Sequence, residues 1–339
     1  MFEWWDLRTA RVVRLAVAAT VGLAIAQIYN WPLAFLTPVI ATALLEIPIP
    51  EMTLRGFLKT ILYSVAMLLG GLLFVLMVQP YPVAFIVAYP LAVFLLAYNL
   101  HRGAPFVPLI MGLIALTIFP VVGLLHGGLT VIVALSVIFS VVLGLVIVEV
   151  VFGLLPDPEG GEKVELPVYQ PGYHAHGARA ALITTIVLSP LVITFHFLNI
   201  PSMVLVLVYG AVIAFEGNLA HGVYDTKKYL TATAIGASAS FPFYFLIVAV
   251  PEFYFFLPLA LVTLLLFALG RFSSSPLAPY LGSAMVAFMI LISTSIGPGA
   301  DLDVNILKRA FMIFFGGAYV VLAMSVVEPL VKRLWPLEH

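Results

Sequence analysis

Twelve predominantly apolar segments follow one another along this chain of 339 residues. Each is as long, or nearly as long, as the roughly 20 helical residues that cross a bilayer core of about 30 Å. With 63% hydrophobic and only 9% charged residues, the chain has too few polar side chains to cover a soluble globule of this size. We therefore predict an all-α polytopic membrane protein. The predicted spans are 12–28, 31–47, 57–78, 82–98, 105–125, 129–153, 179–198, 201–217, 229–250, 253–270, 276–297 and 308–330.

The charge and the cysteine content exclude several functional classes. A formal net charge of −1 and the lack of a basic arm argue against a nucleic-acid partner. The chain has no cysteine, which excludes disulfides and thiolate metal sites. No two histidines have the spacing or the carboxylate neighbours of a metal site, so we expect no metal and no cofactor. The first apolar run has no small-residue cleavage site, so we expect no cleavable signal peptide.

One stretch near the N-terminus returns in the second half of the chain. The first copy is Asn30–Glu46 and the second is Asn199–Glu216. In both copies an Asn stands two residues before a Pro, apolar residues follow, and a Glu ends the run. Such a segment barely spans a bilayer, and Pro38 within the first copy predicts a break in its helix. Short interrupted helices at matching places in two halves indicate a transporter binding site. A short helix packed in the bundle centre, with each Pro at its first position, would give the same pattern.

Further matches occur in the same order along the two halves. Gln27 and Asn30 correspond to His196 and Asn199 at a constant offset of 169 residues. Duplication and fusion of a six-helix unit explains such an ordered series. Because six is even, both copies would have the same orientation and superpose by rotation about the membrane normal. The expected domains are a first six-helix membrane repeat (1–155), a cytoplasmic linker (156–177) and a second six-helix membrane repeat (178–336), and residues 337–339 resemble the start of an appended histidine tag.

The distribution of Lys and Arg predicts the orientation of the chain. If the N-terminus is cytoplasmic, 13 of the 15 Lys and Arg residues fall at the inner ends of the spans, and only Lys308 and Arg309 lie outside. Such an excess of basic residues on one side marks the cytoplasmic face. We therefore expect both termini to be cytoplasmic.

Polar residues at the two ends of the short helices are candidates for substrate contact. Arg11, Arg14 and Arg179 lie at the predicted cytoplasmic mouths, where guanidinium groups could pair with a carboxylate substrate; setting the topology is the alternative role. Gln27, Asn30, His196 and Asn199 lie near the outer face and could line an exit path, or could form hydrogen bonds between helices. The candidate substrate-binding set is Arg11, Arg14, Arg179, Asn30, Pro32, Thr37, Asn199 and Pro201.

Four glutamates within or at the ends of spans are candidates for proton coupling: Glu46, Glu216, Glu149 and Glu328. Ionisable groups at such positions are costly and are often functional. A carboxylate partly withdrawn from water can carry a proton near neutral pH. For Glu149 and Glu328, the alternative is that they reach the interface or pair with Arg179, Lys332 or Arg333.

The entry arginines, the segment Asn-Trp-Pro-Leu-Ala-Phe-Leu-Thr-Pro-Val-Ile-Ala at 30–41 and the six-helix repeat resemble the fusaric-acid-resistance and aromatic-acid exporter superfamily. The closest likeness is to its short, poorly characterised branch, and it covers residues 8 to about 335. That superfamily is also similar to the plant aluminium-activated malate channels. The resemblance implies a multi-pass inner-membrane exporter of aromatic or other organic acids, often working beside a periplasmic membrane-fusion adaptor. The chain lacks the large cytoplasmic domain of the longer exporters, and Pro38 has no counterpart in its second copy.

Three other functions remain open on the sequence. A passive organic-anion channel of the malate type would share the fold with a proton-coupled pump. A membrane-embedded transferase would commonly need an acidic metal-binding pair, and the one close pair, Asp301 and Asp303, falls in a predicted outer loop. No phosphate-binding loop and no nucleophile grouping is present, so we expect no enzyme. An assembly subunit without a transport path is the third.

Overall fold

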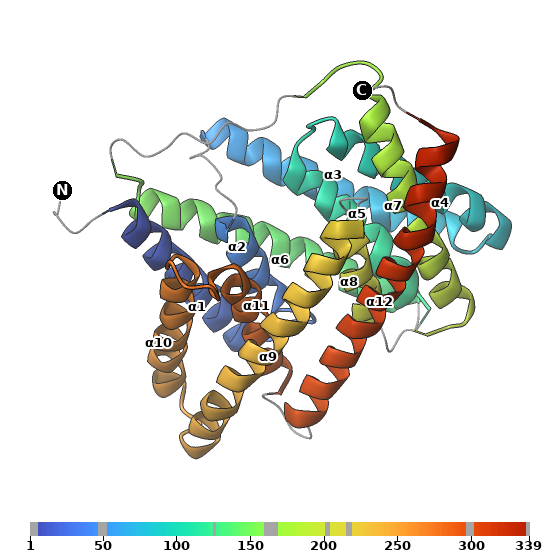
Figure 1. Ribbon diagram of the computed structural model, residues 1–339. Helices are drawn as coiled ribbons and strands as arrows, with labels where there is room; N and C mark the ends of the chain where they lie inside the picture. The colour runs from blue at the N-terminus through green and yellow to red at the C-terminus, as the bar shows by residue number, and fades with distance from the viewer. Residues whose placement is uncertain are drawn as a thin grey trace. The chain divides into compact units, whose positions relative to one another are not determined.

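The computed structural model describes residues 6–46, 53–124, 127–158, 169–200, 204–214, 219–295 and 302–336. Within these ranges the chain is all α-helical, as predicted, and nine helices are long and apolar enough to cross a membrane (Figure 1). The protein is a polytopic membrane protein. The helices are α1 (Leu7–Tyr29), α2 (Leu36–Glu46), α3 (Leu54–Val78), α4 (Pro82–His101), α5 (Phe106–Val122), α6 (Gly127–Leu154), α7 (Ala175–Phe197), α8 (Val204–Ala214), α9 (Leu219–Ala249), α10 (Phe253–Arg271), α11 (Ala278–Ser295) and α12 (Leu302–Leu334).

The described parts of the matching helices α2 and α8 have 11 residues each, which at 1.5 Å per residue gives about 16 Å. The residues that directly follow α2, and those on both sides of α8, lie outside the described ranges. The predicted break at Pro38 is wrong in its position, because α2 begins only at Leu36. Pro38 therefore lies in the first helical turn, where a missing N–H costs no helix hydrogen bond. The interruption is the turn that precedes it, residues 31–35.

The chain divides into two compact units that do not coincide with its two halves. The first unit comprises residues 1–57, 136–165 and 228–310, and the second comprises 58–135, 166–227 and 311–339. The first unit thus contains α1, α2 and most of α6 from one half, with most of α9, α10 and α11 from the other. The second contains most of α3, α4 and α5 with α7, α8 and most of α12.

In the first unit four helices form a closed ring. α1 packs against α2 and α10, and α11 packs against the same two helices; Figure 1 shows the dark-blue α1 beside the brown α10. The core between them is aromatic. The ring of Phe243 in α9 meets that of Phe288 in α11 edge-on at 5.0 Å, and Phe267 of α10 lies 5.7 Å from Phe288. Apolar residues of α1, including Leu15 and Leu23, complete this cluster.

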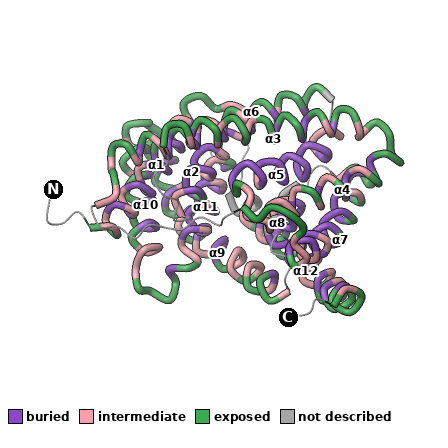
Figure 2. Tube along the Cα trace, turned by 90° about the horizontal axis from the view of Figure 1, so that it is seen from above, coloured by how far each residue is buried: buried purple, intermediate pink, exposed green. Residues whose placement is uncertain are grey.

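The second unit repeats the ring with the halves exchanged. α7 packs against α8 and α4, and α5 packs against the same two helices. Helices α7 and α8 thus take the places of α1 and α2, while α4 and α5 take those of α10 and α11. Figure 2 shows α5 as buried along nearly its whole length, consistent with its central place. Phe85, Tyr89, Leu188 and Leu207 are fully buried in the core of this ring.

Each ring therefore combines the first two helices of one half with the fourth and fifth helices of the other. We expected each half to form its own six-helix bundle, but the compact units cross that boundary because every ring contains helices from both halves.

Close contacts between a glycine of one helix and a small residue of another also occur in both units. A Cβ atom on Gly71 of α3 would lie 2.5 Å from Ala115 Cβ in α5, and one on Gly236 of α9 would lie 2.6 Å from Ala284 O in α11. The division into two sequence repeats and a linker, and their superposition by rotation, stay predictions.

Glycines on neighbouring helices let α2 approach closely. A Cβ atom on Gly22 of α1 would lie 2.9 Å from Pro38 Cα, and one on Gly144 of α6 would lie 3.2 Å from Thr37 O. Gly282 of α11 is the third such glycine, and it faces Glu46. Without side chains at Gly22 and Gly144, α1 and α6 can pack directly on the backbone of α2, while Gly282 leaves room for the Glu46 side chain.

In the second unit the glycine at the contact between the first two helices of the ring lies on the second helix, α8, and not on the first, α7. Leu191 of α7 stands at the position of Gly22, 169 residues later, and it contacts Gly210 of α8, where an added Cβ atom would lie 2.9 Å from Leu191 Cδ2. The glycine is thus on α1 in one ring and on α8 in the other. This exchange explains why Pro38 needs no counterpart in the second copy.

Candidate functional site at the turn between α1 and α2

The two matching asparagines end their helices in the same way. Asn30 has φ 42° and caps α1, with its backbone N–H donating to Ala26 O at 3.0 Å. Asn199 follows α7 with φ 53°. Asparagine is one of the few residues that adopt this left-handed conformation readily, which suits it to a helix end. The shared role of the two asparagines is therefore to turn the backbone.

A second left-handed residue follows within the same turn. Leu33 has φ 60°, a conformation that costs a bulky side chain on the order of 1–3 kcal/mol. Two backbone hydrogen bonds hold the turn, from Ala34 N–H to Trp31 O at 3.0 Å and from Leu36 N–H to Leu33 O at 2.9 Å. Strained backbone of this kind persists where its surroundings fix it, and it is concentrated at ligand sites.

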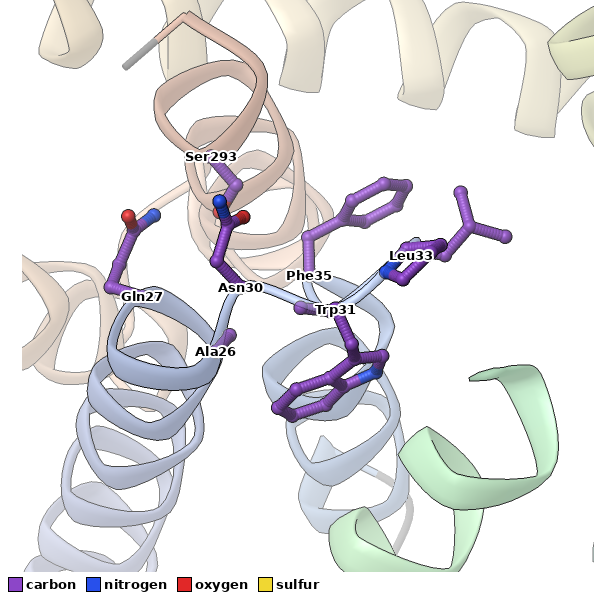
Figure 3. Close-up of a pocket in the computed structure, with 9 residues that line it drawn as sticks. Ala26, Gln27, Asn30, Trp31, Leu33, Phe35 and Ser293 are labelled. Atoms are coloured by element: carbon purple, nitrogen blue, oxygen red, sulfur yellow. The ribbon is translucent and has the colours of Figure 1, made fainter. Parts of the chain in front are cut away.

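The turn forms one wall of a cavity of about 340 Å³ in the first unit. The end of α1 and one residue of α11 supply the rest of the lining. Figure 3 shows the polar side chains of Gln27, Asn30 and Ser293 on one side, and Trp31, Leu33 and Phe35 on the other. None of the described residues that line the cavity is charged. They are Ala26, Gln27, Asn30, Trp31, Pro32, Leu33, Ala34, Phe35 and Ser293.

The polar side of the cavity has unused hydrogen-bonding capacity. Ser293 Oγ is buried and has no hydrogen-bond partner. A buried hydroxyl left without a partner costs about 1–3 kcal/mol, so a water or a bound molecule is expected to supply one. Gln27 is half-buried and Asn30 is exposed beside it. Together they present two amides and one hydroxyl to any occupant.

Trp31, on the aromatic side of the cavity, is held in its orientation by two residues of α6. The indole N–H of Trp31 donates a hydrogen bond to Ser140 Oγ of α6 at 3.0 Å. The Trp31 ring also meets Phe139 edge-on, with 4.9 Å between the ring centroids. Its orientation is therefore fixed by α6, and Phe35 lies on the same turn.

The residue equivalent to Gln27 in the second unit, His196, contacts protein side chains. His196 stands where Gln27 does in the first copy, and its ring packs 4.6 Å from that of Phe85. Gln79 at the end of α3 donates from Nε2 to Pro120 O at 2.8 Å, and the same atom lies 3.4 Å from His196 Nδ1. Gln27 faces an open cavity in the first unit, whereas His196 packs against Phe85 and Gln79 in the second.

Two of the predicted mouth arginines, Arg11 and Arg14, lie on α1 away from this cavity. Arg14 is only 2% exposed; it forms an ion pair with Asp157, and its guanidinium carbon lies 4.3 Å from the Phe152 ring centroid. Arg11 is half-buried one turn earlier in α1. Since Arg14 precedes Asn30 by 16 residues, about 24 Å of helix separates them. In the second unit Arg179 is half-buried and lies within electrostatic range of Glu328.

The four glutamates have different surroundings. Glu46 Oε1 is buried without a hydrogen-bond partner, and its carboxyl group lies against Gly282. Glu328 accepts from Leu219 N–H at 2.7 Å and pairs with Lys332 at 2.5 Å, which is the structural alternative considered for it. Glu149 is half-buried in α6. Glu216 lies outside the described residues.

Of the remaining predicted substrate residues, Pro32 lines the cavity with Asn30. Thr37 is completely buried below it in α2, Asn199 lies in the second unit, and Pro201 lies outside the described residues. Sequence reasoning missed Ser293, which reaches the cavity from a distant helix, and Asp157, which was assigned to the linker. Among the described residues, no group of three His, Asp or Glu side chains is placed to hold a metal ion.

Comparison with known proteins gives one match. Residues 11–151 match a protein family described as "Protein of unknown function (DUF2955)". The matched region begins in α1 and ends in α6. No curated protein and no solved structure matches the chain.

Proposed function

We propose that the protein is a membrane transporter that exports aromatic or other organic acids, and that the cavity beside the α1–α2 turn is its substrate site. The observation that carries this proposal is the cavity itself, which joins aromatic side chains to two amides and to a hydroxyl that has no hydrogen-bond partner in the protein. Binding sites for small molecules are typically apolar concavities with a few polar groups that converge. The strained turn between α1 and α2 is also typical of transporter sites.

Proton coupling through Glu46 is part of the proposal. The cavity lies at the N-terminal end of α2 and Glu46 lies at its C-terminal end, so one short helix connects the two. A buried carboxylate oxygen without a partner is a group whose protonation changes its surroundings substantially. Protonation of Glu46 would therefore shift α2, and with it the wall of the cavity.

The resemblance found in the sequence supplies an inner-membrane location and a periplasmic membrane-fusion adaptor as partner, and the distribution of Lys and Arg residues supplies cytoplasmic termini. No enzymatic reaction is part of the proposal.

Flux measurements on the purified protein in liposomes test this function. We expect labelled benzoic acid to accumulate against its own gradient when a proton gradient is imposed, and not to accumulate without one. Flux that only follows the substrate gradient would identify a passive channel instead. No flux above that of empty liposomes, for any aromatic or aliphatic acid, would contradict transport.

A further inference from the structure

We infer that the cavity binds its ligand in an uncharged form, as a single-ring aromatic compound whose polar group both donates and accepts hydrogen bonds. A protonated carboxylic acid, an amide or an alcohol fits this description, and a carboxylate anion does not. The inference rests on the proposed function in taking the cavity as the substrate site. It narrows the substrate class from an organic anion to its neutral form.

The first argument is the absence of charge around the cavity. Among the residues that the structure describes, the lining contains no ionisable side chain, and α11 carries none apart from Tyr280 between Ala278 and Ser295. The arginines of α1 end at Arg14, which precedes Ala26 by 12 residues, or about 18 Å of helix. Glu46 follows Phe35 by 11 residues, or about 16 Å. Glu252, Lys308 and Arg309, on neighbouring helices, are also outside the lining.

The second argument is the cost of placing an anion there. An ionised carboxylate taken from water needs a cation or several strong donors to compensate for its lost hydration. The mouth arginine that could provide this, Arg14, is already paired with Asp157. A neutral ligand avoids this cost, because only its dipoles have to be matched.

The third argument is the type of polar group that the cavity offers. The amides of Gln27 and Asn30 each provide donors and an acceptor, and the Ser293 hydroxyl both donates and accepts. A carboxylate can only accept, so it would leave the acceptors of this set unmatched. A protonated acid or an amide can pair with donors and acceptors at once.

The fourth argument concerns the apolar part of the ligand. The Trp31 ring is fixed by Ser140 and Phe139, and Phe35 and Pro32 also line the cavity. Rigid aromatic walls favour a flat ring, which can stack or pack edge-on against them. A volume of about 340 Å³ lies at the small end of ligand sites, which suits one ring rather than several.

Direct binding to the full-length protein in lipid nanodiscs tests the inference. The probes are benzamide, benzyl alcohol and benzoate at pH 7, where benzoate is ionised. We expect benzamide and benzyl alcohol to bind at least tenfold more tightly than benzoate. Equal or tighter binding of benzoate, or no binding of the neutral compounds, would overturn the inference.

A pair of matched variants locates the site. Asn30→Gly removes the amide but keeps the left-handed turn, because glycine adopts this conformation freely. It should weaken benzamide binding about fivefold, the value of one hydrogen bond. Asn199→Gly makes the same change in the second unit and should have no effect. Equal effects, or none from Asn30→Gly, would show that the ligand binds elsewhere.

This experiment separates the two proposals. Selective binding of neutral compounds without any flux in liposomes would contradict transport and leave the inference standing. Proton-driven flux together with tighter binding of benzoate would support transport and contradict the inference that the ligand is neutral.

Discussion

The carboxyl group of Glu46, at the end of α2, lies directly against Gly282 of α11, so that a single methyl group added at Gly282 would overlap Oε1. The same oxygen is buried and has no hydrogen-bond partner. A glycine on one helix therefore provides the space in which the carboxyl group of another helix is held with Oε1 buried and without a hydrogen-bond partner, although Arg271 and Lys228 lie within electrostatic range. In terms of stability this is unfavourable, which is the usual sign that a position serves a function.

Gly282→Ala should destabilise the protein by roughly 1–3 kcal/mol, because the new methyl group displaces the Glu46 carboxyl from a packed site. The loss should largely disappear when Glu46→Ala is made in the same chain, since the two side chains then no longer compete for space. Unfolding in detergent measures both. Gly70→Ala is the matched control, because nothing lies within 4 Å of a Cβ atom there. A cost from Gly70→Ala as large as that from Gly282→Ala would mean that contact with Glu46 is not the cause.

Glu46→Gln should abolish accumulation driven by a proton gradient and leave downhill flux in place. Glutamine fills the same space against Gly282 but cannot take up or release a proton. Flux into liposomes, with and without an imposed gradient, separates the two activities. Glu149→Gln, on the half-buried glutamate of α6, should leave accumulation intact. A Glu46→Gln protein that pumps like the parent would show that this carboxylate is structural.

Ser293→Ala should stabilise the unliganded protein by up to about 1 kcal/mol and weaken ligand binding. The hydroxyl is buried without a partner, so its removal relieves a cost of folding. The same hydroxyl is expected to pair with the ligand. Thermal unfolding with and without benzamide checks both effects, since a ligand stabilises the protein in proportion to its affinity. Destabilisation of the unliganded protein by this variant would indicate a structural partner for Ser293.

Cutting the linker should not separate the two halves of the chain. Each ring contains helices from both halves, so the halves are held together by packing as well as by the covalent connection. A protease site placed within residues 159–168 and cleaved in mild detergent should leave both fragments in one peak on size exclusion. If the fragments instead elute apart while each keeps its helical content, the halves fold independently and the exchanged rings are wrong.

The pattern of the sequence predicted the features that repeat. An offset of 169 residues paired Asn30 with Asn199, and both residues adopt the same left-handed conformation. A helix follows each of them, α2 after Asn30 and α8 after Asn199. Regularity along the chain thus indicated the helices, their membrane class and the position of the turn.

Contacts between distant segments could not be predicted in this way. Ser293 joins Asn30 at the cavity although 263 residues separate them, and the hydrophobic pattern of α11 does not show which helix it will face. The same holds for Arg14 and Asp157, which pair across the whole first half of the chain. The combination of helices from both halves in each ring could not be predicted for the same reason. A repeat in the sequence does not show whether the helices of one half pack with each other or with those of the other half.

Labelling of a single cysteine in the cavity tests the central claim most directly, because the chain has no cysteine of its own. Ser293→Cys places a thiol of nearly the same size in the lining, and Thr294→Cys places one on the exposed residue beside it, outside the lining. We predict that a membrane-impermeant thiol reagent added from outside stops flux through the Ser293→Cys protein, and that benzamide slows this reaction. The same treatment should leave flux through the Thr294→Cys protein unchanged. Full flux after complete labelling of Ser293→Cys would contradict the assignment of this cavity as the substrate site.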